Sequence, residues 1–185
     1  IFYSYLLGSI PFGLILTKFF LNKDLRNVGS GNIGATNVLR AGKKFLSILT
    51  LFLDSLKGYI AISIAYKYLP EYIYLSALLC FLGHIFPLWL KFNGGKGIAV
   101  FLGIIFALSI NLGIIFIVTW LIVFFLTRYA SVSSLVSTGI IFLYSVYQEI
   151  FFETMFYFII FVVVIYTHRE NITRLKNKKE NKINL

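Results

Sequence analysis

The first stretch whose residue types could do chemistry is the polar segment 24–40. Its glycines allow tight turns, so that consecutive backbone N–H groups can converge on an anion, and Arg40 can clamp a phosphate through two parallel hydrogen bonds. A flexible polar linker is the alternative, but apolar residues such as Ile33 and Val38 recur along the segment and argue against it. The sequence therefore predicts an anion-binding loop. Its candidate binding residues are Gly29, Ser30, Gly31, Asn32, Asn37 and Arg40.

A second candidate is the glycine-rich run 94–97, which precedes an apolar segment. Glycines before a helix leave N–H groups pointing at the loop, where the helix dipole favours negative charge, and Lys96 adds a full positive charge. The run is not a Walker A loop, because its spacing differs from G-x-x-x-x-G-K-[ST] and Gly97 replaces the required Ser or Thr. A simple helix-start turn explains it equally well. The candidate binding residues here are His84, Gly94, Gly95 and Lys96.

The third polar set follows the later apolar segments. It contains Ser131, Ser133 and the pair His168 and Asn171, which share a helix face because they are three residues apart. An unperturbed histidine pKa of about 6.5 suits His168 to proton transfer. The competing interpretation is that basic residues after a final span only anchor lipid headgroups, and we expect this role for Lys176, Lys178, Lys179 and Lys182.

The composition predicts a membrane protein. Of the 185 residues, 59% are hydrophobic and 13% charged, and the mean hydropathy of +0.87 is far above that of a soluble domain. A membrane-crossing helix needs about 20 apolar residues. With a lone cysteine, Cys80, no disulfide can form within the chain, and the scattered acidic residues and two histidines predict no metal site. The predicted spans are roughly 1–21, 46–69, 72–90, 98–110, 112–127, 132–147 and 150–167.

The distribution of positive charge decides between six and seven spans. Segment 98–110 is short, and it could form one bent helix with the run after Asn111. With seven spans and the N-terminus outside, 15 of the 17 Lys and Arg fall on the cytoplasmic side, counting the basic loop from Lys18 at the inner end of the first span, and only Lys57 and Lys67 do not, as the positive-inside rule favours. We therefore predict an all-α integral membrane protein, a single membrane-embedded domain with seven transmembrane helices and a cytoplasmic C-terminus, and take the first segment as a retained span. The predicted cytoplasmic segments are 22–45, 91–97, 128–131 and the tail 168–185.

Two charged residues lie within a predicted span. Asp54 and Lys57 are three residues apart, so they can pair on one helix face. Because charge inside a membrane is costly, such a pair is a functional hypothesis by default. The first interpretation is a structural pair that orients the first loop, and the second is direct contact with substrate. Small residues within the spans, among them Gly8 and Gly103, predict close helix packing.

Together these segments resemble the bacterial acyl-phosphate:glycerol-3-phosphate acyltransferases, the PlsY family, over nearly the whole chain. The stretches that carry the resemblance are Gly8–Gly13, Gly29–Arg40, Gly83–Gly97, His168-x-x-Asn171 and Arg174-Leu175. The resemblance implies a seven-helix enzyme of the bacterial cytoplasmic membrane. Such an enzyme transfers a fatty acyl group from acyl phosphate to glycerol 3-phosphate, giving lysophosphatidic acid and inorganic phosphate for phospholipid biosynthesis.

The resemblance also implies a polar site without metal or cofactor. Its predicted catalytic residues are Ser30, Lys96, His168 and Asn171, and the implied contacts include Arg40 and either Ser131 or Ser133. Asn93 and Val100 depart from the family pattern, which affects the expected affinity more than activity. The proton acceptor is open among His168, a relay through Ser30, and the donor phosphate.

The partners expected are acyl phosphate, glycerol 3-phosphate and membrane lipids, and no nucleic acid. The competing function is transport or exchange of an organic phosphate. A transporter should show internal repeats and polar groups near the middle of the membrane, but the sequence shows no repeat, and Asp54 and Lys57 lie off-centre, toward the cytoplasm.

Overall fold

A computed structural model describes residues 1–183, and all regular structure within that range is helical. The contacts divide the chain into two compact units, Ile1–Leu108 and Ser109–Leu185. Residues 184–185, the end of the predicted tail, lie outside the described part of the chain.

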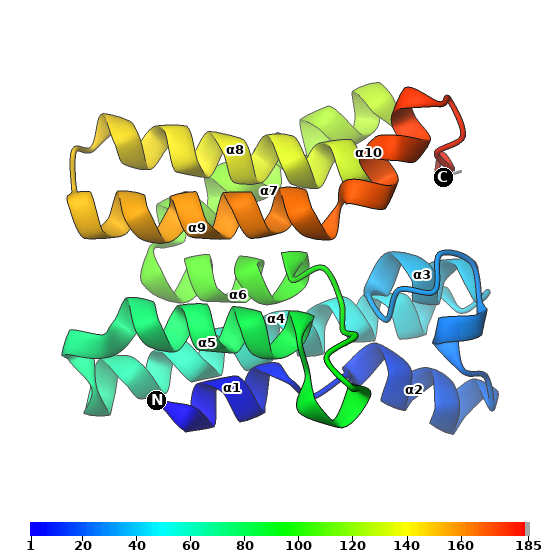
Figure 1. Cartoon of the computed structure of the whole chain (residues 1–185), viewed down its shortest axis with the longest axis horizontal. Coiled ribbons are helices and arrows are strands. Elements are labelled where there is room, and N and C mark those ends of the chain that lie inside the picture. Colours follow the sequence, from blue (N-terminus) through cyan, green and yellow to red (C-terminus); the bar gives the residue numbers. More distant parts are fainter. Residues whose placement is uncertain (184–185) are drawn as a thin grey trace. The chain divides into compact units, whose positions relative to one another are not determined.

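The first unit is built around one long helix. It contains α1 (Phe2–Gly8), α2 (Phe12–Leu21), η1 (Leu25–Asn27), α3 (Ala35–Arg40), α4 (Lys44–Tyr68), η2 (Pro70–Tyr72), α5 (Ile73–Ile85), η3 (Leu88–Leu90) and α6 (Ile98–Leu108). Helix α4 packs against α1, α2, α3, α5 and α6, and α1 also packs against α5 (Figure 1). The predicted turn at Pro70 is confirmed, because η2 separates α4 from α5 there.

Close helix packing in this unit depends on glycine. A Cβ at Gly8 would overlap with the Cys80 carbonyl of α5, and a Cβ at Gly103 would overlap with the Ser55 carbonyl of α4. Both prohibited contacts are with backbone atoms, which cannot move aside as a side chain can. The prediction that small residues let these helices approach closely is confirmed at both positions.

The first predicted span is broken in the middle. Helix α1 ends at Gly8 and α2 begins at Phe12, so segment 1–21 is two helices and not a continuous one. Pro11 lacks an N–H and disfavours helical geometry at the residue before it, which explains the break. Two side chains from elsewhere satisfy carbonyls at the break: Lys57 Nζ donates to Ile10 O at 2.6 Å, and Trp89 Nε1 donates to Ser9 O at 2.6 Å.

The second unit begins with three long helices. They are α7 (Ile110–Thr127), α8 (Ala130–Tyr147) and α9 (Phe151–Thr167), and the shorter α10 (Arg169–Lys176) follows. Helix α8 packs between α7 and α9, and α10 departs from α9 with a bend of 57° (Figure 1). The turn predicted at Gln148-Glu149 is confirmed.

Three boundaries in this part of the chain differ from the prediction. The break expected at Asn111 lies at Ser109, whose Oγ accepts from Leu112 N at 3.5 Å and caps α7. Ser131 lies inside α8 and not in a loop, because α8 begins at Ala130. The tail is helical as far as Lys176, since α10 has an apolar face despite its high charge.

The apolar helices carry the membrane assignment. Within residues 1–183, five segments are long and apolar enough to cross a bilayer: Phe2–Leu21, Lys44–Tyr68, Pro70–Leu90, Ile110–Thr127 and Ala130–Tyr147. The bent pair α9 and α10 is a sixth candidate, and α6 is a shorter apolar helix. Large apolar side chains such as Phe52 and Phe125 are each 59% exposed, which is favourable in lipid and costly in water. The chain is a multi-pass integral membrane protein, and the count of seven spans stays a prediction.

Candidate active site

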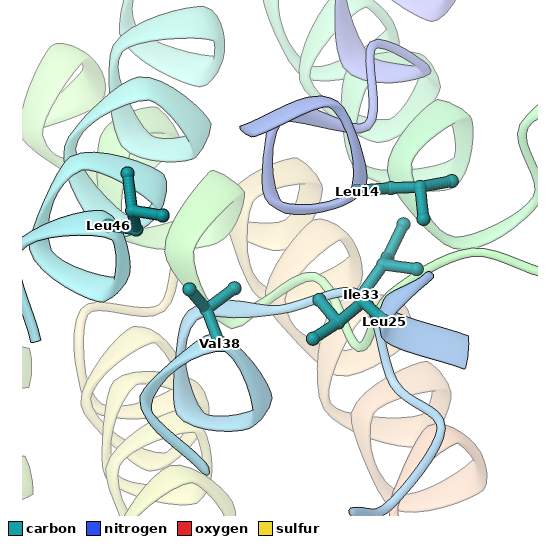
Figure 2. Close-up of a cluster of buried hydrophobic side chains, with 5 residues drawn as sticks. All are labelled: Leu14, Leu25, Ile33, Val38 and Leu46. Atoms are coloured by element: carbon teal, nitrogen blue, oxygen red, sulfur yellow. The ribbon is translucent and has the colours of Figure 1, made fainter. Parts of the chain in front are cut away.

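The first polar loop, residues 22–43, is a folded element and not a flexible linker. Its side chains Leu25, Ile33 and Val38 are at most 2% exposed. They form one apolar cluster with Leu14 of α2 and Leu46 of α4 (Figure 2). Burial of these side chains ties the loop to the helices on either side of it.

A single buried amide organises the backbone of this loop. Asn37 Nδ2 donates to Leu25 O at 3.1 Å, Val28 O at 2.8 Å and Asn32 O at 2.7 Å. Asn37 Oδ1 accepts from Ser30 N at 3.0 Å. Both ends of the amide are therefore occupied by the loop itself, so Asn37, a predicted substrate ligand, shapes the loop that carries the other candidates.

Glycine is required where the loop turns beside Arg40. Gly29 has a φ of +56°, which only glycine adopts at low cost. A Cβ there would also overlap with Asn37 Oδ1 and would lie 3.3 Å from Arg40 Cδ. The half-buried Ser30 follows Gly29 directly, and the side chain of the exposed Arg40 passes beside Gly29. The loop combines a hydroxyl and a guanidinium on neighbouring parts of one backbone turn.

The second polar loop is pinned to the end of α5 through its glycines. Gly94 N donates to Ile85 O at 2.9 Å, and Gly95 N donates to His84 O at 3.0 Å. Lys96 follows directly, half-buried and two residues before the start of α6. This geometry presents one ammonium group next to a helix N-terminus, a combination suited to phosphate.

His84 lies beneath this second loop. Its side chain is 4% exposed. A Cβ at Gly95 would overlap with the Nε2 edge of its ring, so the ring faces the loop backbone directly. The structure thus places this predicted binding residue against the protein's own loop.

In the second unit, His168 lies at the bend between α9 and α10. Its Nδ1 is 2.8 Å from Val164 O. A carbonyl oxygen can only accept, so a neutral ring carries its proton on Nδ1 and its lone pair on Nε2. His168 is 2% exposed. The bend therefore holds a neutral imidazole in the tautomer that carries its lone pair on Nε2.

A carboxylate that the sequence did not suggest joins the other predicted residues of this unit. Glu180 Oε1 accepts from Ser131 Oγ at 3.1 Å and from Asn171 Nδ2 at 2.6 Å, and Glu180 Oε2 accepts from Arg174 Nε at 2.8 Å. Burial on its own would raise the pKa of Glu180, but the hydrogen bonds from Arg174 and Asn171 and the charge of Arg174 outweigh it and hold that pKa below its usual value. Glu180 could not be predicted as part of this cluster, because a single acidic residue among lysines is typical of a solvated segment.

The tail closes over the start of α8 through two further contacts. Ile183 N donates to Arg128 O at 3.0 Å, and Lys182 Nζ lies 5.6 Å from the centre of the Tyr129 ring. The segment directly after Glu180 is thus held against Arg128 and Tyr129, the residues that precede α8. Its position explains how a residue nine places after Asn171 reaches that amide.

The structure separates the two serines that the sequence left as alternatives. Ser131 is linked to Asn171 through Glu180. Ser133 is fully buried, and its Oγ donates within α8 to Tyr129 O at 3.0 Å. Ser131, and not Ser133, therefore belongs to the cluster with Asn171.

These features define a class of protein. Arg40 and Lys96 lie on two glycine-rich loops of the first unit, and His168 lies at the bend between α9 and α10 of the second. Within residues 1–183, no three His, Cys, Asp or Glu side chains are grouped so as to hold a metal ion. The fold and these residues describe a multi-pass membrane enzyme that acts on a phosphorylated substrate.

Comparison with known proteins gives the family. A family profile described as glycerol-3-phosphate acyltransferase matches residues 1–178. A glycerol-3-phosphate acyltransferase of Pelagibacter ubique is 51% identical over 179 residues, covering 97% of this chain and 93% of the relative. One of Wolbachia pipientis wMel is 50% identical over 183 residues, with 97% and 94% covered.

Two solved structures agree with these relatives. Both are crystal structures of PlsY, an integral membrane glycerol 3-phosphate acyltransferase, one in the glycerol 3-phosphate form and one in the lysophosphatidic acid form. The first has a TM-score of 0.94 at 40% identity, and the second a TM-score of 0.90 at 37% identity. Each similarity covers 99% of this chain and 93% of the other.

The chain belongs to the glycerol-3-phosphate acyltransferase family, and the resemblance to PlsY seen in the sequence is confirmed. It is an integral membrane enzyme that transfers an acyl group to glycerol 3-phosphate.

Proposed function

We propose that acyl phosphate is the acyl donor and that inorganic phosphate is released. The hydroxyl oxygen at C1 of glycerol 3-phosphate attacks the acyl carbon, a new C–O ester bond forms, and the bond from the acyl carbon to the phosphate oxygen breaks. The products are lysophosphatidic acid and inorganic phosphate. The observation that carries this proposal is the pair of glycine-rich loops bearing Arg40 and Lys96, since donor and acceptor are then both anions that need cationic partners.

The chemistry requires little from the protein beyond positioning. An acyl phosphate is a mixed anhydride with a good leaving group, so no covalent nucleophile is needed. Holding two substrates in attacking geometry contributes about 7–11 kcal/mol in favourable intramolecular systems. In our proposal, Lys96, Arg40 and the amides of Gly94, Gly95 and the 29–32 turn hold the phosphates, and Ser30, Asn32, Ser131 and Asn171 orient the substrates.

We assign the proton transfer to His168. The bond from Nδ1 to Val164 O leaves the lone pair on Nε2, so the ring can accept the hydroxyl proton as the ester forms. His168→Ala should lower kcat by about 100-fold, within the usual range for a general base. His168→Gln is the matched variant that keeps a polar side chain. Near-normal turnover in both variants would exclude the histidine and leave the donor phosphate as proton acceptor.

The donor assignment has a direct assay. Purified protein is incubated with glycerol 3-phosphate and an acyl phosphate, and phosphate release and lysophosphatidic acid are measured together. We expect equal amounts of the two products, and no product when acyl-CoA or acyl carrier protein replaces the acyl phosphate. Product from acyl-CoA but not from acyl phosphate would overturn the donor. Vesicle uptake of glycerol 3-phosphate without any product would favour the transporter.

We also propose seven spans in a bacterial cytoplasmic membrane, with the N-terminus outside and the polar loops in the cytoplasm. Positive charge supports this orientation, because 14 of the 17 Lys and Arg residues lie in the predicted cytoplasmic segments and Lys18 lies at the cytoplasmic end of the first span, which leaves only Lys57 and Lys67 elsewhere.

Single-cysteine labelling tests this topology in a Cys80→Ala background. Cysteines that replace Glu71 or Glu149 should react with a membrane-impermeant maleimide in intact cells. Cysteines that replace Asn22, Asn93 or Lys178 should react only after the membrane is opened. Labelling of Asn93 and Lys178 from opposite sides would overturn the proposal.

A further inference from the structure

Two buried charges that the proposed reaction does not use meet a buried histidine in the first unit. Asp54 and Lys57 of α4 are 1% and 3% exposed, and His84 of α5 is 4% exposed. Lys57 Nζ lies 2.7 Å from Asp54 Oδ1, 3.0 Å from His84 Nδ1 and 2.6 Å from Ile10 O. The pairing of Asp54 with Lys57 predicted from the sequence is confirmed, and the pair reaches the α1–α2 break and α5.

The ammonium group of Lys57 decides the state of the histidine. A protonated lysine has three donors and no lone pair, and three acceptors surround it. The contact with Asp54 is a charge pair whose geometry departs from an aligned hydrogen bond. Because Lys57 can only donate, His84 Nδ1 accepts, and the ring proton of a neutral His84 lies on Nε2.

The Nε2 edge of His84 is the edge that faces the second polar loop. A Cβ added to Gly95 would overlap with Nε2, and its three nearest neighbours would all be atoms of the His84 ring. The backbone of His84 contacts the same residue, since its carbonyl accepts from Gly95 N. Lys96 is the next residue in the chain. A shift of the His84 ring would therefore move the backbone of Gly95 and, with it, the backbone of Lys96.

Buried charge of this kind is expensive. A buried ion pair is often no more stable than apolar residues of the same shape, so the gain in fold stability from Asp54 and Lys57 is a weak reason for their presence. The pair instead fixes the orientation of the His84 ring, through the contact of Lys57 Nζ with His84 Nδ1. The break between α1 and α2 supplies a further acceptor for the ammonium group, Ile10 O.

We propose that Asp54, Lys57 and His84 form a positioning network. The network fixes the backbone at Gly95 and thereby sets the orientation of the Lys96 side chain. Asp54 and Lys57 act through His84 and touch neither substrate. The inference rests on the proposed role of Lys96 in binding a phosphorylated substrate, and it adds three residues that control that role.

The first test is a pair of double-mutant cycles on the loop. Gly95→Ala introduces a Cβ whose obstacle is the His84 side chain, whereas Gly94→Ala introduces one whose obstacles include the backbone carbonyls of His84 and Ile85. Each is combined with His84→Ala. If the network exists, adding Gly95→Ala to the His84→Ala variant lowers activity little further, because the obstacle to the new Cβ is gone. Adding Gly94→Ala to the same variant lowers activity by as much as it does in the wild type. Equal additivity in both cycles would overturn the contact between ring and loop.

The second test removes the charges together, so that no unpaired charge stays buried. Lys96→Arg identifies the substrate whose KM depends on Lys96. The variant Asp54→Asn/Lys57→Met should raise the KM for that same substrate by about tenfold, which is the effect of one lost hydrogen bond to a charged group. Its kcat should change less. Lys67→Met, a lysine on the same helix α4 and outside the network, is the matched control and should behave as the wild type. A double variant with the wild-type KM would overturn the proposal.

A third measurement does not depend on the acyl donor. Hydrogen exchange of the full-length protein is followed by mass spectrometry for a peptide covering 91–97 and for peptides from α8. In the Asp54→Asn/Lys57→Met variant, the 91–97 amides should exchange about tenfold faster while α8 is unchanged. Faster exchange throughout the chain would show that the network only stabilises the fold, and unchanged exchange at 91–97 would also overturn the proposal. If the wild type is inactive with acyl phosphate, only the proposed acyl donor is contradicted. The exchange result still tests the positioning network, because it does not depend on the donor.

Discussion

The two units hold their polar residues by different means. In the first unit the backbone shapes the polar loops: glycines turn it, Asn37 binds its carbonyls, and Arg40 and Lys96 lie on these loops. In the second unit, side chains on helix ends are joined by one carboxylate, Glu180. The first arrangement should be sensitive to added volume and indifferent to pH, while the second should tolerate volume and respond to the loss of one charge.

The largest effect is expected at the cation of the first unit. Lys96→Ala should lower kcat/KM by about 100- to 1,000-fold, the range found when a group that stabilises transition-state charge is removed. The measurement is phosphate release at varied glycerol 3-phosphate. Lys91→Gln, an exposed lysine of the same loop, is the matched control and should retain activity. A fully active Lys96→Ala protein that elutes as the wild type would contradict the phosphate-binding role.

Volume added inside the first loop should have the next largest effect. Gly29→Ala forces an L-residue to a positive φ and brings a Cβ onto Asn37 Oδ1. The positive φ lowers stability by about 1–2 kcal/mol, and the overlap with Asn37 Oδ1 displaces the turn that carries Ser30, for which we expect at least a tenfold loss of kcat/KM.

The matched variant for this effect is Gly42→Ala. Gly42 also has a positive φ, but a Cβ there meets nothing within 4 Å. Gly42→Ala should therefore lower the unfolding temperature while leaving the kinetics close to wild type. Equal kinetic losses in the two variants would show that backbone strain, and not the packing against Asn37, shapes the loop.

Removal of the Glu180 charge in the second unit should lower activity and change how stability depends on pH. Glu180→Gln weakens the acceptor for Asn171 and Arg174, and we expect about a tenfold loss of activity near neutral pH, the effect of one lost charge-assisted hydrogen bond. The pKa of Glu180 in the folded protein is lowered from an ordinary value of 4.5. The stabilisation by the carboxylate is therefore complete above pH 4.5 and is lost as the pH falls through the lower folded-state pKa.

This pH dependence is measured by comparing unfolding temperatures of wild type and Glu180→Gln. The difference should be constant above pH 4.5 and should shrink below it. Gly29→Ala, in the other unit, should show a difference from wild type that does not follow this profile. A gap between wild type and Glu180→Gln that widens on acidification would contradict the assigned role of the carboxylate.

The smallest effect separates two serines. Ser131→Ala removes a donor to Glu180 and should lower activity several-fold, in keeping with a net contribution of about 1 kcal/mol for one hydrogen bond. Ser133→Ala removes a bond within α8 and should leave activity near wild type. Steady-state rates for the two variants at saturating substrate decide the point, and the reverse order would move the substrate contact to Ser133.

Much of the fold could be predicted, because lipid imposes simple rules. The apolar runs and the turns at Pro70 and Gln148-Glu149 were visible in the sequence, since a helix in a membrane must be long, apolar and internally hydrogen-bonded. The break at Ile10 was not predicted. Its cause is local at Pro11, but its stability depends on Lys57 and Trp89, which come from far along the chain.

The candidate site divides in the same way. Residue types, spacing and the family resemblance predicted Arg40, Lys96, His168 and Asn171, because cations on glycine-rich loops and a histidine beside a helix end suit a phosphorylated substrate. Spacing could not show that Asn37 is turned inward. It also gave no signal for Glu180, which reaches Asn171 only because the tail folds back over α8.

The sequence alone determined the solvent, the helical class, the family resemblance and the residue types of the chemistry, since each follows from composition or from short-range patterns. The tertiary structure decided which polar groups are committed to the protein and which serine belongs to the Asn171 cluster. It also showed how the Asp54 and Lys57 charges reach the loop of Lys96. Those outcomes depend on hydrogen bonds between residues far apart in the chain, and such partners are chosen by packing and not by sequence separation.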